Sequence, residues 1–191
     1  CNFFRSDYST TYTNLFQKTY IMTNRLDVVG IGNAMVDAII PSTQVEIEKH
    51  DINRDSMNLI DENLKNNLHQ SYTIKEMAGG GSLGNSMFGI ASFGGNGSFI
   101  GKIKNDEIGV YLQKDMVREG LKFPLGFTSP DISTGCCTIF VEEDGTRTMC
   151  TFLGAGTLIG PEDINKQDII NHKIAYLEGY LWDNDKEKQA M

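Results

Sequence analysis

The sequence predicts an α/β fold, with a Rossmann-like layer of parallel strands and flanking helices joined to a small β-sheet appendage. Short apolar runs such as "LDVVGIG" (26–32) alternate with amphipathic segments, as expected where each parallel strand is followed by a helix. The segment "CCTIFVEEDGTRTMCTFLG" (136–154) interrupts this alternation with two β-rich runs around an Asp144-Gly145 turn, which is typical of a hairpin. The chain has 191 residues, of which 40% are hydrophobic, so it can bury a core of this kind.

The individual elements follow from hydrophobic spacing and capping residues. We expect strands at 26–32, 97–103 and 173–183, and helices at 61–72, 82–94, 105–120 and 161–172. The segments "VEIEKHDI" (45–52) and "MNLID" (57–61) mix alternation with turn residues, which favours exposed strands. These strands and the hairpin are expected to lie outside the main sheet.

Composition excludes several classes of function. The 25 acidic and 17 basic side chains give a net charge of −8, which argues against binding to nucleic acid or an anionic membrane. No apolar run approaches the length of a membrane span. The four Cys and three His residues show no metal-ligand spacing, so we expect no metal site and reduced thiols, as in a cytoplasmic protein.

Two glycine patterns resemble nucleotide-binding motifs and fail. "VVGIGNAM" has Gly30 and Gly32, but Met35 stands where the closing glycine of a dinucleotide motif belongs. "GNGSFIGKI" has Ile103 where a Walker loop requires Ser or Thr. Neither segment therefore predicts a nucleotide phosphate site.

Asn33 and Asp37 form a more specific pair. They lie four residues apart directly after the first expected strand, at the edge where α/β sheets bind ligands. An amide and a carboxylate can hydrogen-bond paired hydroxyls, as a sugar requires. The alternative is that Asn33 caps the next segment and Asp37 is a solvated turn residue.

The stretch "AGGGSLGNS" (78–86) leads into an expected helix. Its consecutive glycines are costly in ordered structure, which indicates that some group approaches the main chain closely or that the chain bends sharply here. Gly80 and Gly81 allow a flat sugar to lie on the main chain, and Asn85 offers an amide in the first helical turn. A simple loop bend is the alternative reading.

These residues, taken in order, resemble the ribokinase-like (PfkB) carbohydrate kinases, and the adenosine-kinase-like branch in particular. The resemblance covers about residues 22–191 and is carried by "VVGIGNAMVD", "AGGGSLGNSMFGIASFGG", "FIGKIKNDEIG", "DGTRTMCTFLGAG" and "YLEGYLWD". It implies a ribokinase fold in which a β-sheet lid, with strands around 41–60 and 121–154, closes over the substrate.

The resemblance also implies roles for individual residues. Asn33 and Asp37 match the ribose-binding pair. Gly80, Gly81 and Asn85 match the substrate clamp. Cys137 and Met149 match apolar lid positions near the base or sugar, and Arg147 matches a lid arginine that reaches the transferring phosphate. Before the resemblance is counted, a cross-strand salt bridge is an equal alternative for Arg147. Cys150 stands where the branch usually has Asn, which puts one substrate hydrogen bond in doubt.

The activity that the resemblance implies is ATP- and Mg²⁺-dependent phosphotransfer to the hydroxymethyl group of a nucleoside or sugar. The Gly-Ala-Gly-Asp motif with the general base is absent, since "GAGT" (154–157) carries Thr157 instead. We therefore expect residues 22–191 to be the N-terminal part of the kinase domain, without the ATP-binding half, and residues 1–21 to be an extension outside the fold. Such a chain is expected to be inactive alone, as a monomer or a lid-mediated homodimer. A silent nucleoside- or sugar-binding module and another PfkB sugar kinase, such as a ribokinase or fructokinase, are the alternatives.

Overall fold

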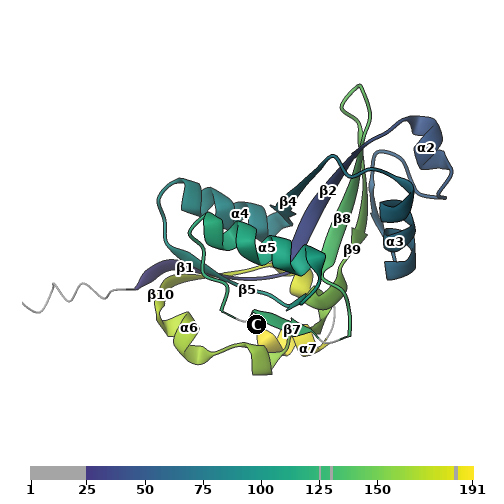
Figure 1. Cartoon of the computed structure of the whole chain (residues 1–191). Helices are drawn as coiled ribbons and strands as arrows, with labels where there is room; N and C mark the ends of the chain where they lie inside the picture. The colour runs from purple at the N-terminus through teal and green to yellow at the C-terminus, as the bar shows by residue number, and fades with distance from the viewer. Residues whose placement is uncertain (1–24, 125, 130, 183–184) are drawn as a thin grey trace, which may run out of the picture.

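A computed structural model of the chain describes residues 25–124, 126–129, 131–182 and 185–191 (Figure 1). The expected extension over residues 1–21 lies outside the described residues. Two sheets dominate the fold. A three-stranded parallel sheet forms the base, and a five-stranded mixed sheet rises from it (Figure 1). The α/β class and the separate β appendage are both confirmed.

The base sheet has the strand order β10-β1-β5, and all its pairs are parallel. Its strands are β1 (Leu26–Ile31), β5 (Gly97–Ile100) and β10 (His172–Leu177). The strand expected at 97–103 is divided in two. The first part, β5, ends at Ile100, and a separate β6 (Ile103–Lys104) pairs with β7 (Phe127–Ser129). The third expected strand is also shorter than predicted, since a 3₁₀ helix, η3 (Gly179–Trp182), follows β10.

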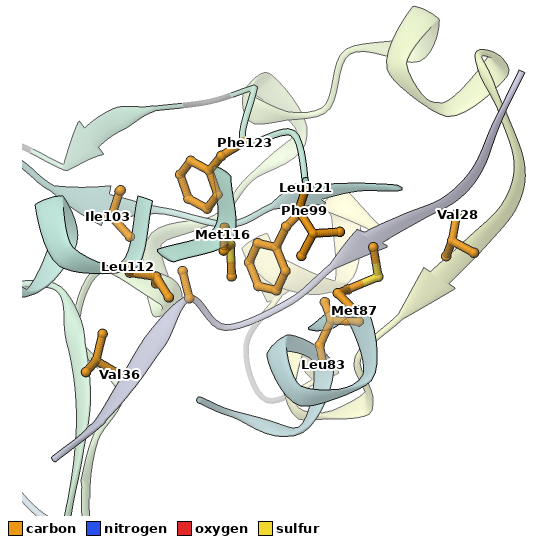
Figure 2. Close-up of a cluster of buried hydrophobic side chains, with 11 residues drawn as sticks. Val28, Val36, Leu83, Met87, Phe99, Ile103, Leu112, Met116, Leu121 and Phe123 are labelled. Carbon is orange, nitrogen blue, oxygen red and sulfur yellow. The ribbon is translucent and has the colours of Figure 1, made fainter. Parts of the chain in front are cut away.

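Helices cover both faces of the base sheet (Figure 1). The first face is covered by α4 (Ser82–Ser92) and α5 (Glu107–Arg118), and the second carries α6 (Lys166–Ile170) and α7 (Asp185–Ala190). Figure 2 shows the first core, in which Met87 of α4 and Met116 of α5 approach Phe99 of β5. The ring of Phe99 stacks on that of Phe123 with 5.9 Å between centroids. An aspartate caps the start of α5, since the Asp106 carboxylate accepts a hydrogen bond from the Gly109 backbone amide at 2.8 Å.

The five-stranded sheet, hereafter the lid sheet, has the order β3-β9-β8-β2-β4. Its strands are β2 (Met35–Pro41), β3 (Met57–Leu59), β4 (Glu76–Gly80), β8 (Gly135–Val141) and β9 (Arg147–Phe152). The antiparallel pair β8–β9 is the predicted hairpin. Sequence analysis missed β2 and β4, which pair antiparallel with each other. A carboxylate interrupts the apolar run of β2, and the glycines of β4 have low strand propensity.

Three other segments also differ from expectation. Part of 45–52 is a helix, α2 (Gln44–Glu48), because the Glu46 carboxylate accepts from the Thr43 amide at 2.8 Å and closes a helix start. The expected helix at 161–172 divides into η2 (Pro161–Asp163) and α6, and "GAGT" falls in η1 (Gly154–Leu158). The helix expected at 61–72 is present as α3 (Glu62–Ser71), capped by Asp61.

The two faces of the lid sheet have different surroundings. Its back face carries Ile40, Phe140 and Cys150, which pack against Ile47 of α2 and Leu68 of α3. Its front face has a cluster to which no helix contributes within the described residues. The members of this front-face cluster are Met35, Cys137 and Ile139, with Val141, Met149 and Leu153 packed against them.

Candidate functional site

The residues predicted for the lid lie on its front face. Strand pairing sets Asp37 beside Cys137, Cys137 opposite Thr151 and Val141 opposite Arg147. Because side chains alternate along strands, Asp37, Cys137, Met149 and Arg147 all project to one side. Asp37 therefore belongs to a strand of the lid sheet, whereas the sequence analysis placed it at the edge directly after β1 and gave a solvated turn as the alternative.

The close approach of the Asp37 carboxyl group explains why position 80 is a glycine. A Cβ atom at Gly80 would lie 2.3 Å from both Cγ and Oδ1 of Asp37, so the carboxyl group rests directly on the bare main chain. This contact explains one of the consecutive glycines from within the protein. Burial raises the pKa of the Asp37 carboxyl above its ordinary value.

The neighbouring glycines have separate reasons. Gly81 has a φ of +78° and lies at the N-cap of α4, a conformation that favours glycine. The Phe88 ring fills the space that a Cβ at Gly79 would need, at 2.5 Å. The Gly79 amide also donates to Asp115 Oδ2 at 3.0 Å, which joins β4 to α5. The structure therefore shows both the bend, at Gly81, and a close approach to the bare main chain. The groups that approach are side chains of the protein itself, Asp37 at Gly80 and Phe88 at Gly79.

Asn33 is nearly enclosed at the end of β1. Its side chain is 4% exposed, and its Oδ1 has no hydrogen-bond partner within the described part of the chain. A Cβ at Gly156 would lie 2.6 Å from that Oδ1, so the main chain of η1 covers the amide. A buried acceptor without a donor is costly, which makes Asn33 a candidate ligand-binding group.

Glu178 is a site residue that the sequence analysis did not identify. It lies directly after β10, is 5% exposed, and its Oε2 accepts a hydrogen bond from the backbone N–H of Asn33 at 2.7 Å. It also accepts from Ser82 Oγ at 2.5 Å and the Leu83 amide at 3.1 Å. Because Gly81 has no side chain, Glu178 supplies the missing cap of α4 from the far end of the chain. The available signal was an acidic residue at the carboxyl end of a strand in "YLEGYLWD".

Asn85 lies in the first turn of α4, as predicted. Its backbone amide donates to the Gly81 carbonyl at 3.0 Å, and its side chain is exposed. The structure thus places Gly80, Gly81 and Asn85 in one continuous strand-to-helix connection.

The lid residues differ in their accessibility. Burial raises the pKa of the Cys137 thiol to about 11, and Thr151 Oγ1 donates to its sulfur at 3.3 Å. Met149 is half-buried. Cys150 is fully buried on the back face, so the structure does not support the predicted effect of this residue on a substrate contact.

Arg147 is exposed at the start of β9 and forms no ion pair within the described residues. Its cross-strand neighbour is Val141, and the nearby Glu142 is paired with Arg54 at 2.8 Å. The cross-strand salt bridge considered for Arg147 is therefore not formed, and the guanidinium is available to an anion.

An open cavity of about 230 Å³ adjoins the ends of β3 and β9 in the lid sheet. Thr151 lines it and also belongs to the front face. Most of its other lining residues are apolar: Leu59, Ile60, Ile132, Phe152 and Leu153, with Gly154 and Thr157. The cavity therefore offers an apolar environment at the end of β9, and it shares Leu153 with the front-face cluster.

Neither a metal centre nor a membrane span is found in the described part of the chain. No group of three or more His, Cys, Asp or Glu side chains there is arranged to hold a metal ion. Among the same residues, none of the helices has the length and apolarity to cross a membrane.

Comparisons with known proteins agree with this fold. The sequence model described as pfkB family carbohydrate kinase matches residues 27–191. The adenosine kinase of Sinorhizobium meliloti is 37% identical with a TM-score of 0.78, over 87% of this chain and 51% of that one. A probable sugar kinase protein from Rhizobium etli CFN 42 is 35% identical with a TM-score of 0.77, over 87% of this chain and 50% of that one.

A curated relative gives a shorter match. The bifunctional ribokinase/ribose-5-phosphate isomerase A of Fructilactobacillus sanfranciscensis is 31% identical over 110 residues, which are 56% of this chain and 20% of that protein. The chain thus spans about half the length of the two solved structures and a fifth of the curated relative. The division at residue 22 and a lid-mediated dimer stay predictions.

Proposed function

Because the chain belongs to the pfkB family of carbohydrate kinases, we propose that it carries the acceptor-binding half of an ATP-dependent kinase. The acceptor is a nucleoside or sugar, and its hydroxymethyl oxygen receives the phosphoryl group. In this reading the lid sheet closes over the acceptor, with its front face inward.

The unpaired acceptor at Asn33 carries this proposal. Asn33 Oδ1 is buried without a donor, and the Asp37 carboxylate is desolvated against Gly80. Two hydroxyl groups on adjacent carbons would donate to these two groups and remove both penalties on binding. Asn85 would add an amide from α4. A ligand without hydroxyl groups would leave the Asn33 oxygen unpaired and the Asp37 carboxylate desolvated. The site therefore favours an acceptor that contains a sugar.

A nucleoside fits the surroundings better than a sugar alone. The front-face cluster and the cavity beside it are mostly apolar, and such surfaces bind the flat face of a base. Cys137 and Met149 would contact the base or sugar from the lid. This reading supports an adenosine-kinase-like activity, with ribose or fructose as the competing acceptors.

Arg147 is the residue of this chain that we assign to the transferring phosphate. Its exposed guanidinium, on the same side as Asp37, can stabilise negative charge once the lid closes. ATP with Mg²⁺ would supply the phosphoryl group. Among the described residues, no group of three or more His, Cys, Asp or Glu side chains is arranged to hold Mg²⁺. We also assign no general base within this chain.

Calorimetric titration with adenosine, ribose and fructose tests the proposal. We expect saturable binding of adenosine, weakened at least tenfold, about 1.4 kcal/mol, by Asp37→Ala or Asn33→Ala. Asp51→Asn is the matched control, because Asp51 is exposed in the loop after α2 and its φ of 51° suits asparagine. Binding of ribose or fructose alone would identify a sugar kinase instead. Absence of binding to all three would overturn the proposal.

Thiol protection gives an independent readout. The pKa of about 11 keeps Cys137 mostly protonated at neutral pH, so alkylation should be slow and should accelerate with rising pH. Bound nucleoside should slow modification of Cys137 while leaving that of Cys150 on the back face unchanged, as followed by peptide mass spectrometry. Equal protection of both cysteines would indicate general stabilisation and not contact with the front face.

A further inference from the structure

Strand β4 lies at one edge of the lid sheet, yet its outer backbone groups have partners. Within the described residues β4 pairs only with β2, so one side of its main chain has no neighbouring strand. On that side the Met77 carbonyl accepts a hydrogen bond from the Tyr111 hydroxyl. Two residues later, the Gly79 amide donates to Asp115 Oδ2 at 3.0 Å. Helix α5 therefore supplies the hydrogen bonds that a further strand would supply.

Helix α5 connects this edge of the lid sheet to the base of the molecule. Tyr111 and Asp115 are four residues apart, so they lie on one side of the helix. The adjacent positions Leu112 and Met116 pack in the first core (Figure 2). Asp115 is only 6% exposed and is paired with Arg118 of the same helix. A buried carboxylate is costly unless it is hydrogen-bonded and paired, so these contacts fix Asp115 in place.

The same strand supports the Asp37 carboxyl group. The register of β2 and β4 sets Asp37 opposite Ala78, so the next two residues of β4 run beside it. A Cβ at Gly80 would lie 2.3 Å from Asp37 Oδ1, so a small shift of β4 would change how far the carboxyl group is covered. Gly79, whose amide binds Asp115, directly precedes Gly80. The hydrogen bond that fixes β4 is therefore one residue from the contact with Asp37.

We propose that Tyr111 and Asp115 are positioning residues for the acceptor site, because they hold β4 where its main chain supports Asp37. Both act through the main chain of β4 and not by contact with the acceptor. The role of Asp37 toward an acceptor rests on the proposed function, whereas the hold on β4 does not. The competing explanation is that the two side chains only protect an edge strand. They would then affect stability and not the recognition of hydroxyl groups.

Tyr111→Phe gives a test without ligand, because it removes one hydroxyl group and changes no charge. We expect β4 to loosen and water to reach Asp37, so the raised pKa of its carboxyl should fall toward the ordinary value. NMR titration of the Asp37 carboxyl carbon measures this change. Cys137 is the titratable side chain in register with Asp37 on β8, and with a pKa of about 11 it stays protonated while a carboxyl titrates. An unchanged pKa of Asp37 would overturn the proposal.

Calorimetric titration with adenosine and 2′,3′-dideoxyadenosine tests the consequence for recognition. Asp115→Ala should weaken adenosine binding about tenfold and dideoxyadenosine binding much less, because only adenosine offers hydroxyl groups to Asp37. Asp115→Asn should restore much of the affinity, since its amide oxygen can still accept from Gly79. Glu119→Gln is the matched control, because it removes the other carboxylate partner of Arg118 and should leave both affinities unchanged. Equal weakening of both ligands by Asp115→Ala would support edge protection alone and overturn the proposal.

A double-mutant cycle separates this inference from the proposed function. If Asp115 acts through Asp37, Asp115→Ala should cause no further loss of adenosine affinity in a chain that already carries Asp37→Ala. An additive further loss would overturn the positioning role and leave the proposed function intact. Conversely, a wild-type chain may bind no nucleoside or sugar while Tyr111→Phe still lowers the pKa of Asp37. That result would refute only the proposed function and would support the hold of α5 on β4.

Discussion

The back face of the lid sheet buries Phe140 and Cys150 against α2 and α3, whereas the front face carries Asp37 and receives no helix within the described residues. The same strands form both faces. On the back, apolar packing stabilises the lid. On the front, burial raises the pKa of the Asp37 carboxyl, and at the end of β1 the Asn33 Oδ1 is buried with no hydrogen-bond partner among the described residues; both features are unfavourable for the folded state. Such local cost is common where a site is arranged for a ligand.

The largest expected effect on stability comes from removing a buried aromatic ring from the back face of the lid sheet. Phe140→Ala removes a fully buried ring that also meets Tyr72 edge-on at 5.2 Å between centroids. We expect it to lower the free energy of unfolding by about 3–5 kcal/mol, as measured by urea denaturation. The matched front-face variant Met149→Ala should cost less, because Met149 is only half-buried. Equal losses would mean that the front face is packed as firmly as the back.

Gly80→Ala should have the next largest effect. Its Cβ would meet the Asp37 carboxyl at 2.3 Å, so we expect a loss of about 1–3 kcal/mol in the free energy of unfolding. Asp37→Ala removes every atom of that clash, and the double variant should recover most of the loss. A strictly additive double-mutant cycle would show that Gly80 is needed for some other reason.

Asp37→Asn should stabilise the unliganded chain slightly while weakening ligand binding. Because burial raises the pKa of Asp37 in the folded protein, its contribution to stability is complete below the unfolded pKa and is lost as pH rises through the folded pKa. The variant should therefore melt higher than the wild type at pH 7, and this advantage should disappear in acid. The carboxylate is not fully enclosed, so screening limits the gain to less than about 1 kcal/mol. A wild type that melts higher at pH 7 would mean that the ionised carboxylate is stabilised by an unseen partner.

Arg147→Ala is expected to change stability least. The guanidinium is exposed and unpaired among the described residues, so thermal melting should indicate a change within about 0.5 kcal/mol. A loss above 1 kcal/mol would revive the salt-bridge interpretation and argue against a phosphate role. Any effect of this variant should appear in the rate of phosphotransfer by an enzyme that contains the whole domain.

Local sequence determined much of this protein. Alternating apolar runs and capping aspartates predicted the parallel strands and the starts of α3 and α5, and Asp144-Gly145 predicted the hairpin, because these signals act over a few residues. The resemblance drawn from ordered motifs also identified the family. The positions of Asn33 and Asp37 suggested a binding site, which stays a prediction. The structure places Asp37 within strand β2, whereas the sequence analysis placed it directly after the first strand.

Tertiary structure decided how that site is held. Glu178 contacts Asn33 and α4 across 145 and 95 residues of chain, and no local pattern encodes such distances. The need for glycine at position 80 arises only when β4 lies beside β2 and brings the main chain under Asp37. The glycines of β4 have low strand propensity, so the sequence did not predict this strand. Pairing with β2 stabilises it although its local preference is unfavourable. The sequence by itself therefore determined the elements and the candidate residues, and long-range pairing and burial determined which groups meet.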